Sequence, residues 1–397
     1  MVKLILKKGR DESLRRFHPW IFSGAIAGVE GEPAEGDLVK VFSVDGEYLA
    51  AGHYQIGSIA VRVLSFVGDP FSGSFWEDAI GSALALRRSL GLCSSDSTNC
   101  YRLVHGEGDG LPGLIIDYYD GVCVMQAHSV GMFKAKLEIC NALVKLYGAS
   151  LKAVYDKSSG TAPFKAGLDL VDGYLYKSDA LKSDQLAVLE GGHKFFVNWS
   201  EGQKTGFFLD QRLNRALVER YAAGRKVLNL FCYTGGFSVY ALAGGAVSVD
   251  SVDSSSKAMM MVDRNVELNF GKDAPHRSFC TDAIDFLGSV EKGTYDLMIV
   301  DPPAFAKHRG ALRNALRAYQ RLNAAAISKV APGGFVFTFS CSQVVDKEAF
   351  SLAVFSAAAQ AGRRVRILDR LCQAPDHSVN IFHPEGEYLK GLLLYIE

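Results

Sequence analysis

The sequence predicts an α/β protein whose C-terminal half is built on a parallel sheet with helices on both faces. From about residue 226, short apolar runs at 227–231, 247–252, 297–300 and 334–340 alternate with helical patterns such as 257–268 and 312–330. Strands that alternate with helices are typical of a parallel sheet, whose chemistry lies at the carboxyl ends of the strands. The earlier part of the chain has a different pattern, with β-like runs separated by glycines and one strong hairpin signal.

Three domains are expected along the chain. Residues 1–73 contain β-like runs at 38–42 and 59–66 and one short helical turn in "FHPWIFSGAI", which predicts a small β-rich barrel. Residues 74–188 begin with a helical pattern at 75–92, and two later apolar runs are joined by Asp120-Gly121, a hairpin signal. This middle part is expected to be an α+β domain. Residues 189–397 hold the parallel sheet.

Composition limits the classes of protein that need consideration. The chain has 397 residues, of which 48% are hydrophobic and 22% charged, as in a globular protein of about two or three domains. A formal net charge of zero argues against a protein that coats nucleic acid, so an anionic partner should meet a local basic patch. The eight cysteines include no C-x-x-C pair, so neither a metal site nor a disulfide framework is expected. The chain shows no signal peptide and no apolar run of about 18 residues, which predicts a cytoplasmic protein without a membrane partner.

The first strand of the C-terminal domain ends in a glycine-containing loop that is expected to bind a cofactor. In "KVLNLFCYTGGFS" the apolar run stops before Gly235-Gly236, where the backbone can turn tightly and approach a ligand closely. Asp253 ends the next strand, and its carboxylate can accept both ribose hydroxyls of an adenosine cofactor. A dinucleotide would lack its G-x-G-x-x-G cradle, which favours S-adenosylmethionine. A Gly-Gly pair alone often only caps a strand, but Asp253 and Asp282 strengthen the functional interpretation, and Cys232 is interpreted as a packed core residue.

The fourth strand of the domain ends in "DLMIVDPPAFAKH", which is expected to bind the methyl acceptor. Pro302 and Pro303 cannot donate ladder hydrogen bonds and make the turn rigid, so Asp301 would be held facing the cleft. Such a turn could grip a planar base, although it could also be only a stiff connection to the next helix.

The fifth strand ends in "FVFTFSCSQ", where Cys341 has two readings. A buried cysteine usually behaves as a small inert hydrophobe. Alternatively, a thiol at the mouth of a buried strand could act as a nucleophile, and only its surroundings can decide between the two readings. Cys341 is therefore a candidate nucleophile. Its activation requires a basic neighbour such as Lys307 or the arginines described next.

A basic stripe follows the Asp301 turn. Residues 307–329 contain no acidic residue, and their arginines recur at every fourth position, so on a helix they share one slowly drifting face. This face could be simply solvated, but its position beside the turn favours a track for RNA phosphates. The expected RNA contacts are Pro302, Pro303, Phe305, Lys307, Arg309, Arg313, Arg317 and Arg321.

Five motifs give the chain a family resemblance over essentially its whole length. In order, they are "QKTGFFLDQRLNR", "VLNLFCYTGGFS", "VDPPAFAK", "FSCS" and "HPEGEYLKGLLL". Together they resemble the class I S-adenosylmethionine-dependent methyltransferases of the large-subunit ribosomal RNA 5-methylcytosine methyltransferase I type. The resemblance implies an N-terminal PUA domain, a central α+β domain, a C-terminal Rossmann-like methyltransferase domain, a 23S ribosomal RNA substrate and a homodimer.

Carried over onto matching positions, the resemblance implies two groups of site residues. The catalytic residues would be Cys341 and Asp301. A Cys341 thiolate that adds to carbon 6 of cytosine would raise the electron density on carbon 5, which is otherwise too electron-poor to accept a methyl group, and Asp301 would hydrogen-bond a cytosine that has left its stack. The cofactor contacts would be Gln203, Thr205, Asp210, Arg212, Phe231, Tyr233, Thr234, Gly235, Gly236, Asp253, Asp282 and Asp301. Many 5-methylcytosine RNA methyltransferases carry a second cysteine where this chain has Pro303, so the base that removes the carbon 5 proton is left open.

Two other functions fit parts of the sequence. Asp-Pro-Pro followed by an aromatic residue resembles the clamp of amino-directed methyltransferases, which act on guanine or adenine and need no thiol. A PUA-type RNA-binding protein with a degenerate catalytic domain is a further alternative, against which the intact glycine loop, Asp253 and Asp301 argue.

Overall fold

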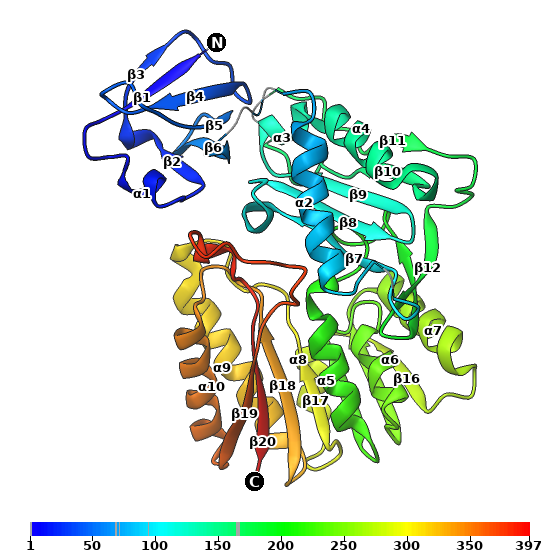
Figure 1. Cartoon of the computed structure of the whole chain (residues 1–397). Coiled ribbons are helices and arrows are strands. Elements are labelled where there is room, and N and C mark those ends of the chain that lie inside the picture. Colours follow the sequence, from blue (N-terminus) through cyan, green and yellow to red (C-terminus); the bar gives the residue numbers. More distant parts are fainter. Residues whose placement is uncertain (1, 68–69, 71, 94, 164–166) are drawn as a thin grey trace. The chain divides into compact units, whose positions relative to one another are not determined.

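The computed structural model in Figure 1 describes residues 2–67, 70, 72–93, 95–163 and 167–397. The chain divides into two compact units. The first comprises Met1–Val188, Val197–Phe207 and Pro375–Gly386, and the second comprises Leu189–Phe196, Phe208–Ala374 and Glu387–Glu397. Each unit is therefore assembled from segments that lie far apart in the sequence.

The N-terminal part of the first unit is a mixed sheet with strand order β2-β6-β5-β4-β1-β3. Its strands are β1 (Lys3–Leu6), β2 (Trp20–Phe22), β3 (Ile26–Glu30), β4 (Leu38–Phe42), β5 (Tyr48–Tyr54) and β6 (Ile59–Ser65). Alternate residues of β4 point inward, so Val39 and Val41 join Leu4, Leu6 and Val61 in one core. A short helix α1 (Glu12–Arg15) precedes β2, and the expected helical turn is limited to a 3₁₀ turn at Ser23–Ala25.

The middle part of the first unit is a second sheet covered by helices. Its strand order is β11-β10-β9-β8-β7, from β7 (Cys100–His105), β8 (Leu114–Tyr119), β9 (Val122–Ala127), β10 (Ala153–Asp156) and β11 (Gly173–Lys177). The helices are α2 (Phe75–Ser89), α3 (Val130–Lys134) and α4 (Lys136–Tyr147). The predicted hairpin is confirmed: β8 and β9 are antiparallel, and Asp120 and Gly121 have φ of 44° and 93°. A two-stranded sheet, β12 (Gln185–Glu190) with β13 (His193–Asn198), follows.

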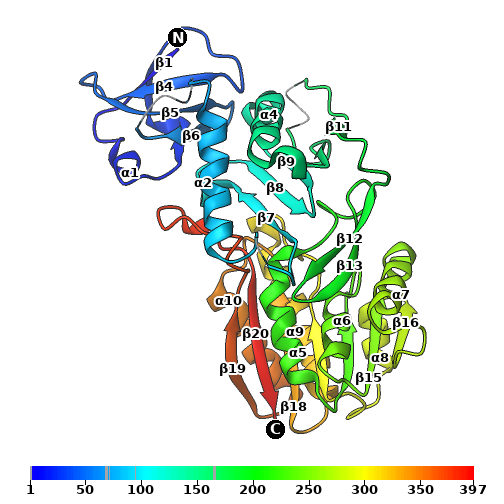
Figure 2. The same cartoon turned by 45° about the vertical axis from the view of Figure 1, so that its right-hand side comes forward.

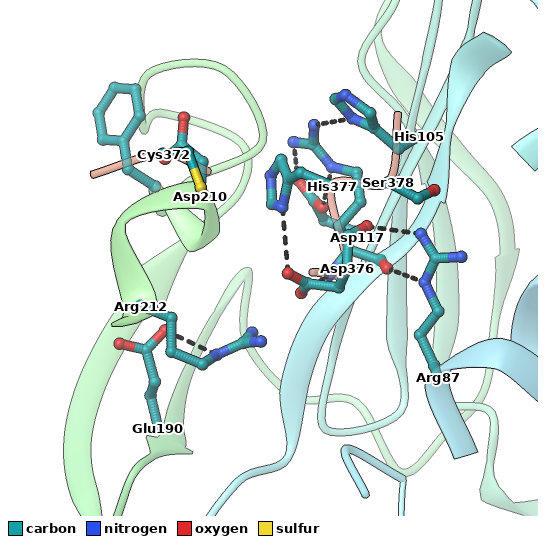
Figure 3. Close-up of polar contacts among 12 residues, drawn as sticks. Arg87, His105, Asp117, Glu190, Asp210, Arg212, Cys372, Asp376, His377 and Ser378 are labelled. Carbon is teal, nitrogen blue, oxygen red and sulfur yellow. Dashed lines mark hydrogen bonds and ion pairs between the residues drawn. The ribbon is translucent and has the colours of Figure 1, made fainter. Parts of the chain in front are cut away.

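Residues Pro375–Gly386, close to the end of the chain, belong to this first unit. The Arg102 amide donates to Oδ2 of Asp376 at 3.0 Å, and Arg87 Nη2 donates to the Asp376 carbonyl at 2.5 Å. Figure 3 shows Arg87, Asp376 and His377 in this cluster, and the Asp376 and His377 side chains are both buried. Arg87 also forms a buried ion pair with Asp109. The C-terminal segment is thus held by buried polar contacts.

The second unit contains the predicted α/β sheet. Its strand order is β16-β15-β14-β17-β18-β20-β19. The strands are β14 (Lys226–Leu230), β15 (Ser248–Asp253), β16 (His276–Cys280), β17 (Leu297–Val300), β18 (Gly334–Ser340), β19 (Val365–Leu371) and β20 (Lys390–Ile396). The strands from β16 to β18 are parallel, as predicted, whereas β20 runs antiparallel to β18 and to β19.

Helices cover both faces of this sheet, as Figures 1 and 2 show. They are α5 (Arg212–Ala222), α6 (Gly236–Ala243), α7 (Ser256–Phe270), α8 (Ala283–Ser289), α9 (Leu312–Lys329) and α10 (Lys347–Ala361). A core of fully buried side chains, including Leu230, Val300, Tyr319 and Phe350, packs the sheet against α8, α9 and α10. This rigid layer holds the carboxyl ends of β14, β15, β17 and β18, where the candidate residues lie.

Candidate active site at the carboxyl ends of the strands

The loop after β14 has an unusual backbone. Phe231 and Tyr233 have positive φ angles of 58° and 47°, and Gly235 has φ of 80°. Positive φ is uncommon for residues other than glycine, and such conformations cluster at functional sites. The loop is held by a hydrogen bond from the Cys232 amide to the Val252 carbonyl at 3.1 Å and by one from Asn265 to the Thr234 carbonyl at 2.9 Å. The glycine loop is therefore fixed before any ligand binds.

Asp253 braces this loop from the end of β15. Its Oδ2 accepts a hydrogen bond from the Tyr233 amide at 3.0 Å, and its Oδ1 accepts one from the Ser255 amide at 2.9 Å. An ionised carboxylate has about four lone-pair sites for hydrogen bonds. The half-buried Asp253 can therefore still accept hydrogen bonds from the hydroxyl groups of a ligand. Cys232 is buried, as predicted, and burial together with the Asp253 charge raises the pKa of its thiol well above the ordinary value.

A buried ion pair lies beneath the glycine loop. Arg215 donates from Nε and Nη2 to the two Glu190 carboxylate oxygens at 2.7 and 2.8 Å, and from Nη1 to the Phe208 carbonyl at 2.9 Å. A Cβ added at Gly236 would stand 3.0 Å from Cδ of Arg215, so the loop rests directly on this side chain. Arg212 Nε lies 3.4 Å from Glu190 Oε2, the contact drawn in Figure 3. The predicted cofactor residue Arg212 thus shares its carboxylate with a structural arginine.

Asp282 has a local structural role. It is the N-cap of α8, where its Oδ1 accepts hydrogen bonds from the amides of Ile284 and Asp285 at 2.8 and 3.0 Å. The side chain is otherwise exposed beside the end of β16. Its predicted cofactor contact would therefore use the other carboxylate oxygen.

The residues of the first motif have different surroundings. Gln203 is exposed, whereas Thr205 is buried and donates to Oδ2 of Asp117 at 2.5 Å. In the second unit, Asp210 accepts from the Tyr388 hydroxyl at 2.6 Å. These contacts fix the segment, and the predicted cofactor roles of its residues stay predictions.

Asp301 follows β17 and is oriented by a residue that the sequence analysis did not single out. Gln211 Nε2 donates to Asp301 Oδ2 at 3.0 Å, while Gln211 Oε1 accepts from Asn214 Nδ2 at 2.6 Å. Gln211 is buried, so this short chain of side chains positions the half-buried Asp301 carboxylate. The only sequence signal for Gln211 was its place in the motif segment "DQR". Its contact with Asp301 could not be predicted, because the two residues are 90 positions apart.

The Asp301 turn and Cys341 lie on neighbouring strands, as predicted. β17 and β18 are parallel with Val300 opposite Thr338, so both strands end at the same edge. Cys341 is partly exposed between buried Ser340 and Ser342. Ser342 Oγ accepts from the Ala306 amide at 3.3 Å and is 3.2 Å from the Tyr319 hydroxyl, which ties the cysteine loop to the residues after Pro303.

Some of the other predicted RNA contacts are buried or half-buried, and the rest are exposed to solvent. Phe305 is half-buried and packs on Tyr319, with ring centroids 4.7 Å apart, and Pro302 is buried. Pro303 and the basic side chains are exposed: Lys307, Arg309, Arg313, Arg317 and Arg321. Arg309 lies in a 3₁₀ turn and the other three arginines lie along α9. In the described part of the chain none of these four arginines forms an ion pair.

Comparisons with known proteins identify the family. Residues 167–382 match the S-adenosylmethionine-dependent methyltransferase family, and residues 4–66 match the PUA-like domain family. The ribosomal RNA large subunit methyltransferase I of Klebsiella pneumoniae (strain 342) is 38% identical over 396 residues, covering 98% of this chain and 97% of the relative. That of Erwinia tasmaniensis is 40% identical, covering 98% of each chain. The chain belongs to the ribosomal RNA large subunit methyltransferase I family.

Solved structures support the fold of this family member. A protein proposed to be a methyltransferase, crystallised with SAH, has a TM-score of 0.84 at 23% identity over the full length of both chains. A protein proposed to be a SAM-dependent methyltransferase from Streptococcus mutans has a TM-score of 0.82 at 22% identity, also over both full lengths. The predicted fold class, a Rossmann-like methyltransferase domain with a PUA-like domain and a central domain, is confirmed, as is dependence on S-adenosylmethionine. Among the described residues, no helix is long and apolar enough to cross a membrane.

Proposed function

We propose that this protein methylates carbon 5 of a cytosine in large-subunit (23S) ribosomal RNA, with Cys341 as the nucleophile. Relatives that match almost the whole chain are named as ribosomal RNA large subunit methyltransferases. The observation that carries the choice of carbon 5 is the position of a partly exposed thiol at the end of β18, beside the Asp301 turn at the end of β17. An amino-directed methyltransferase has no use for a thiol at this position.

The cofactor half of the proposed site is the edge formed by β14, β15 and β16. The fixed loop Phe231–Gly236 and the remaining lone pairs of Asp253 fit an adenosine cofactor, and Asp282 closes the same edge of the sheet. Thr234, Tyr233, Asp210 and Arg212 complete the proposed set within the second unit. When bound here, S-adenosylmethionine supplies an electrophilic methyl group on its sulfonium.

The acceptor half would work through Asp301 and Cys341. Cytosine leaves its stack and its edge is held by Asp301, which Gln211 keeps in place and which favours protonation of the base at N3. The Cys341 thiolate forms a bond from Sγ to carbon 6, and the electron pair of the carbon 5–carbon 6 double bond moves towards carbon 5. After carbon 5 has gained the methyl group it loses its proton, the double bond returns and the Sγ–carbon 6 bond breaks. Phe305, Pro302 and Pro303 would pack against the base.

The arginine stripe, formed by Arg309 in its 3₁₀ turn and by the three arginines on α9, is the proposed phosphate track. The arginine side chains are exposed, and the first of them follows the Asp301 turn closely in the sequence. Exposed positive charges can neutralise RNA phosphates, which supplies most of the sequence-independent affinity for RNA. We also propose that the protein acts in the cytoplasm as a homodimer, which the family resemblance supports, and that its domains are residues 1–73, 74–188 and 189–397.

Replacement of the thiol tests the proposed function. Cys341→Ala should bind S-adenosylmethionine and RNA almost normally but form no 5-methylcytosine, measured by mass spectrometry of nucleosides from the methylated RNA. The matched control Cys372→Ala, which replaces an exposed cysteine elsewhere, should remain active. Wild-type protein should also form a covalent complex with RNA that carries 5-fluorocytosine, because the fluorine blocks the last elimination. A methyl group on an exocyclic nitrogen, or carbon 5 methylation by Cys341→Ala, would refute the proposal and favour the amino-directed alternative.

A further inference from the structure

Lys390 is held beside Cys341 by the register of the sheet. β18 and β20 are antiparallel, and Lys390 is the cross-strand partner of Ser340, the residue before the cysteine. The Lys390 side chain is almost fully buried, with 4% of the residue exposed. Its Nζ donates to the Ser342 carbonyl and to the Tyr388 carbonyl, each at 2.6 Å. Because an ammonium has three N–H donors, two of them fix its position and one remains for a neighbouring anion.

The ammonium of Lys390 is buried, and the nearby carboxylates do little to balance its charge. Desolvation lowers the pKa of its ammonium from 10.5 to about 8, and the Cys341 thiolate, followed by Asp346 and Glu387, opposes that shift. Both carboxylates have other partners, since Asp346 caps α10 through the Ala349 amide at 2.7 Å and Glu387 pairs with Lys347 at 2.5 Å. Lys347 adds a further positive charge. The anion best placed to stabilise this ammonium is therefore the thiolate itself.

We infer that Lys390 is a positioning residue that stabilises the thiolate form of Cys341 through the charge of its anchored ammonium. This inference rests on the proposed role of Cys341 as the nucleophile. It assigns the activating charge to β20 and not to Lys307 or the arginine stripe. Those side chains are exposed, where water and salt screen their charge, whereas a buried ammonium acts through a medium of lower polarity. A thiol beside a cation is more acidic than a free cysteine and is a better nucleophile at neutral pH.

The pH dependence of the thiol tests this inference directly. Iodoacetamide alkylation of Cys341 in the full chain is followed from pH 5 to 10 by mass spectrometry of its peptide, which separates it from the other cysteines. Lys390→Gln removes the charge but keeps an N–H donor for the carbonyls, so the midpoint of alkylation should rise by about one pH unit, a roughly tenfold loss of thiolate at pH 7. Lys390→Arg should keep most of the wild-type profile. The control Lys347→Gln, at a half-exposed neighbouring lysine, should shift it little.

A second measurement on the wild type keeps the test independent of any folding defect. If the exposed arginines acidified the thiol, raising the salt concentration from 50 to 500 mM would move the alkylation midpoint upward, because salt screens exposed charges. With Lys390 responsible, the midpoint should stay almost constant. A salt-dependent midpoint, or a wild-type profile in a folded Lys390→Gln variant, would overturn the inference.

The two proposals can fail separately. If Cys341→Ala still methylates carbon 5 while Lys390→Gln shifts the alkylation midpoint, the lysine–thiolate pair stands and the nucleophile assignment falls. If Cys341→Ala is inactive and Lys390→Gln alkylates like the wild type, the role of Lys390 falls and the proposed function stands. Calorimetric binding of S-adenosylmethionine by each variant reports whether the second unit is intact.

Discussion

Replacing Glu190 by glutamine should destabilise the second unit strongly, although the two side chains have the same shape. Glu190 is fully buried and accepts two hydrogen bonds from Arg215, at 2.7 and 2.8 Å, with the Tyr240 hydroxyl 3.2 Å from Oε1. The amide would present N–H donors to a guanidinium and leave a buried positive charge uncompensated. Removing one partner of a buried ion pair costs about 3–5 kcal/mol, which is of the order of a third to a half of the stability of many proteins.

The loss should appear in urea unfolding followed by circular dichroism and should be localised by hydrogen exchange. Amides of β14 and of the loop 231–236 should exchange faster, because Arg215 supports Gly236 and the Phe208 carbonyl. The control is Glu219→Gln, which removes the charge of a carboxylate that is 35% exposed and lies 3.0 Å from His193 Nε2. It should cost less than about 1 kcal/mol. Equal losses from the two variants, or a loss below about 1 kcal/mol from Glu190→Gln, would refute this account of the buried pair.

Two predictions concern ligands of the proposed site. Asp253→Ala should weaken S-adenosylmethionine binding by about ten- to a hundredfold, or roughly 1.5–3 kcal/mol, because a charged acceptor is lost, while the exposed Asp273→Ala should bind normally. Calorimetry measures both, and unchanged affinity in Asp253→Ala would place the ribose elsewhere. Arg313→Ala with Arg317→Ala should flatten the slope of log affinity for RNA against log salt by about 0.7–0.9 per lost phosphate contact, unlike Lys272→Ala. An unaltered slope would exclude the phosphate track.

Local sequence signals predicted the strands that carry the site. The apolar runs before Phe231, Asp301 and Cys341 became β14, β17 and β18, because buried parallel strands read as continuous hydrophobic stretches. No apolar run located β16 (His276–Cys280), because an edge strand with exposed polar residues has no such run. The antiparallel β20 was also missed, since the pairing of Ser340 with Lys390 depends on a return of the chain from distant sequence.

Side-chain partners were less predictable than strands. The sequence proposed Lys307 or the arginine stripe as the basic neighbour of Cys341, whereas the structure brings a lysine from the last strand to the cysteine loop. Gln211 lies inside the first motif, but its contact with Asp301 was not predicted. Both contacts join residues that are far apart in sequence, and neither residue type has a pattern that marks it. The roles of the site residues stay predictions until the variants are measured.

The placement of Pro375–Gly386 in the first unit affects how the protein can be made and cut. Asp376 supplies partners for the Arg102 amide and for Arg87, so an N-terminal fragment that stops near Val188 would leave these buried donors unmatched. Excision of either unit at a single boundary should accordingly give a poorly folded product. During synthesis, the first unit is complete only after residue 386 has left the ribosome, so its final packing must follow translation of the second unit's segment 208–374.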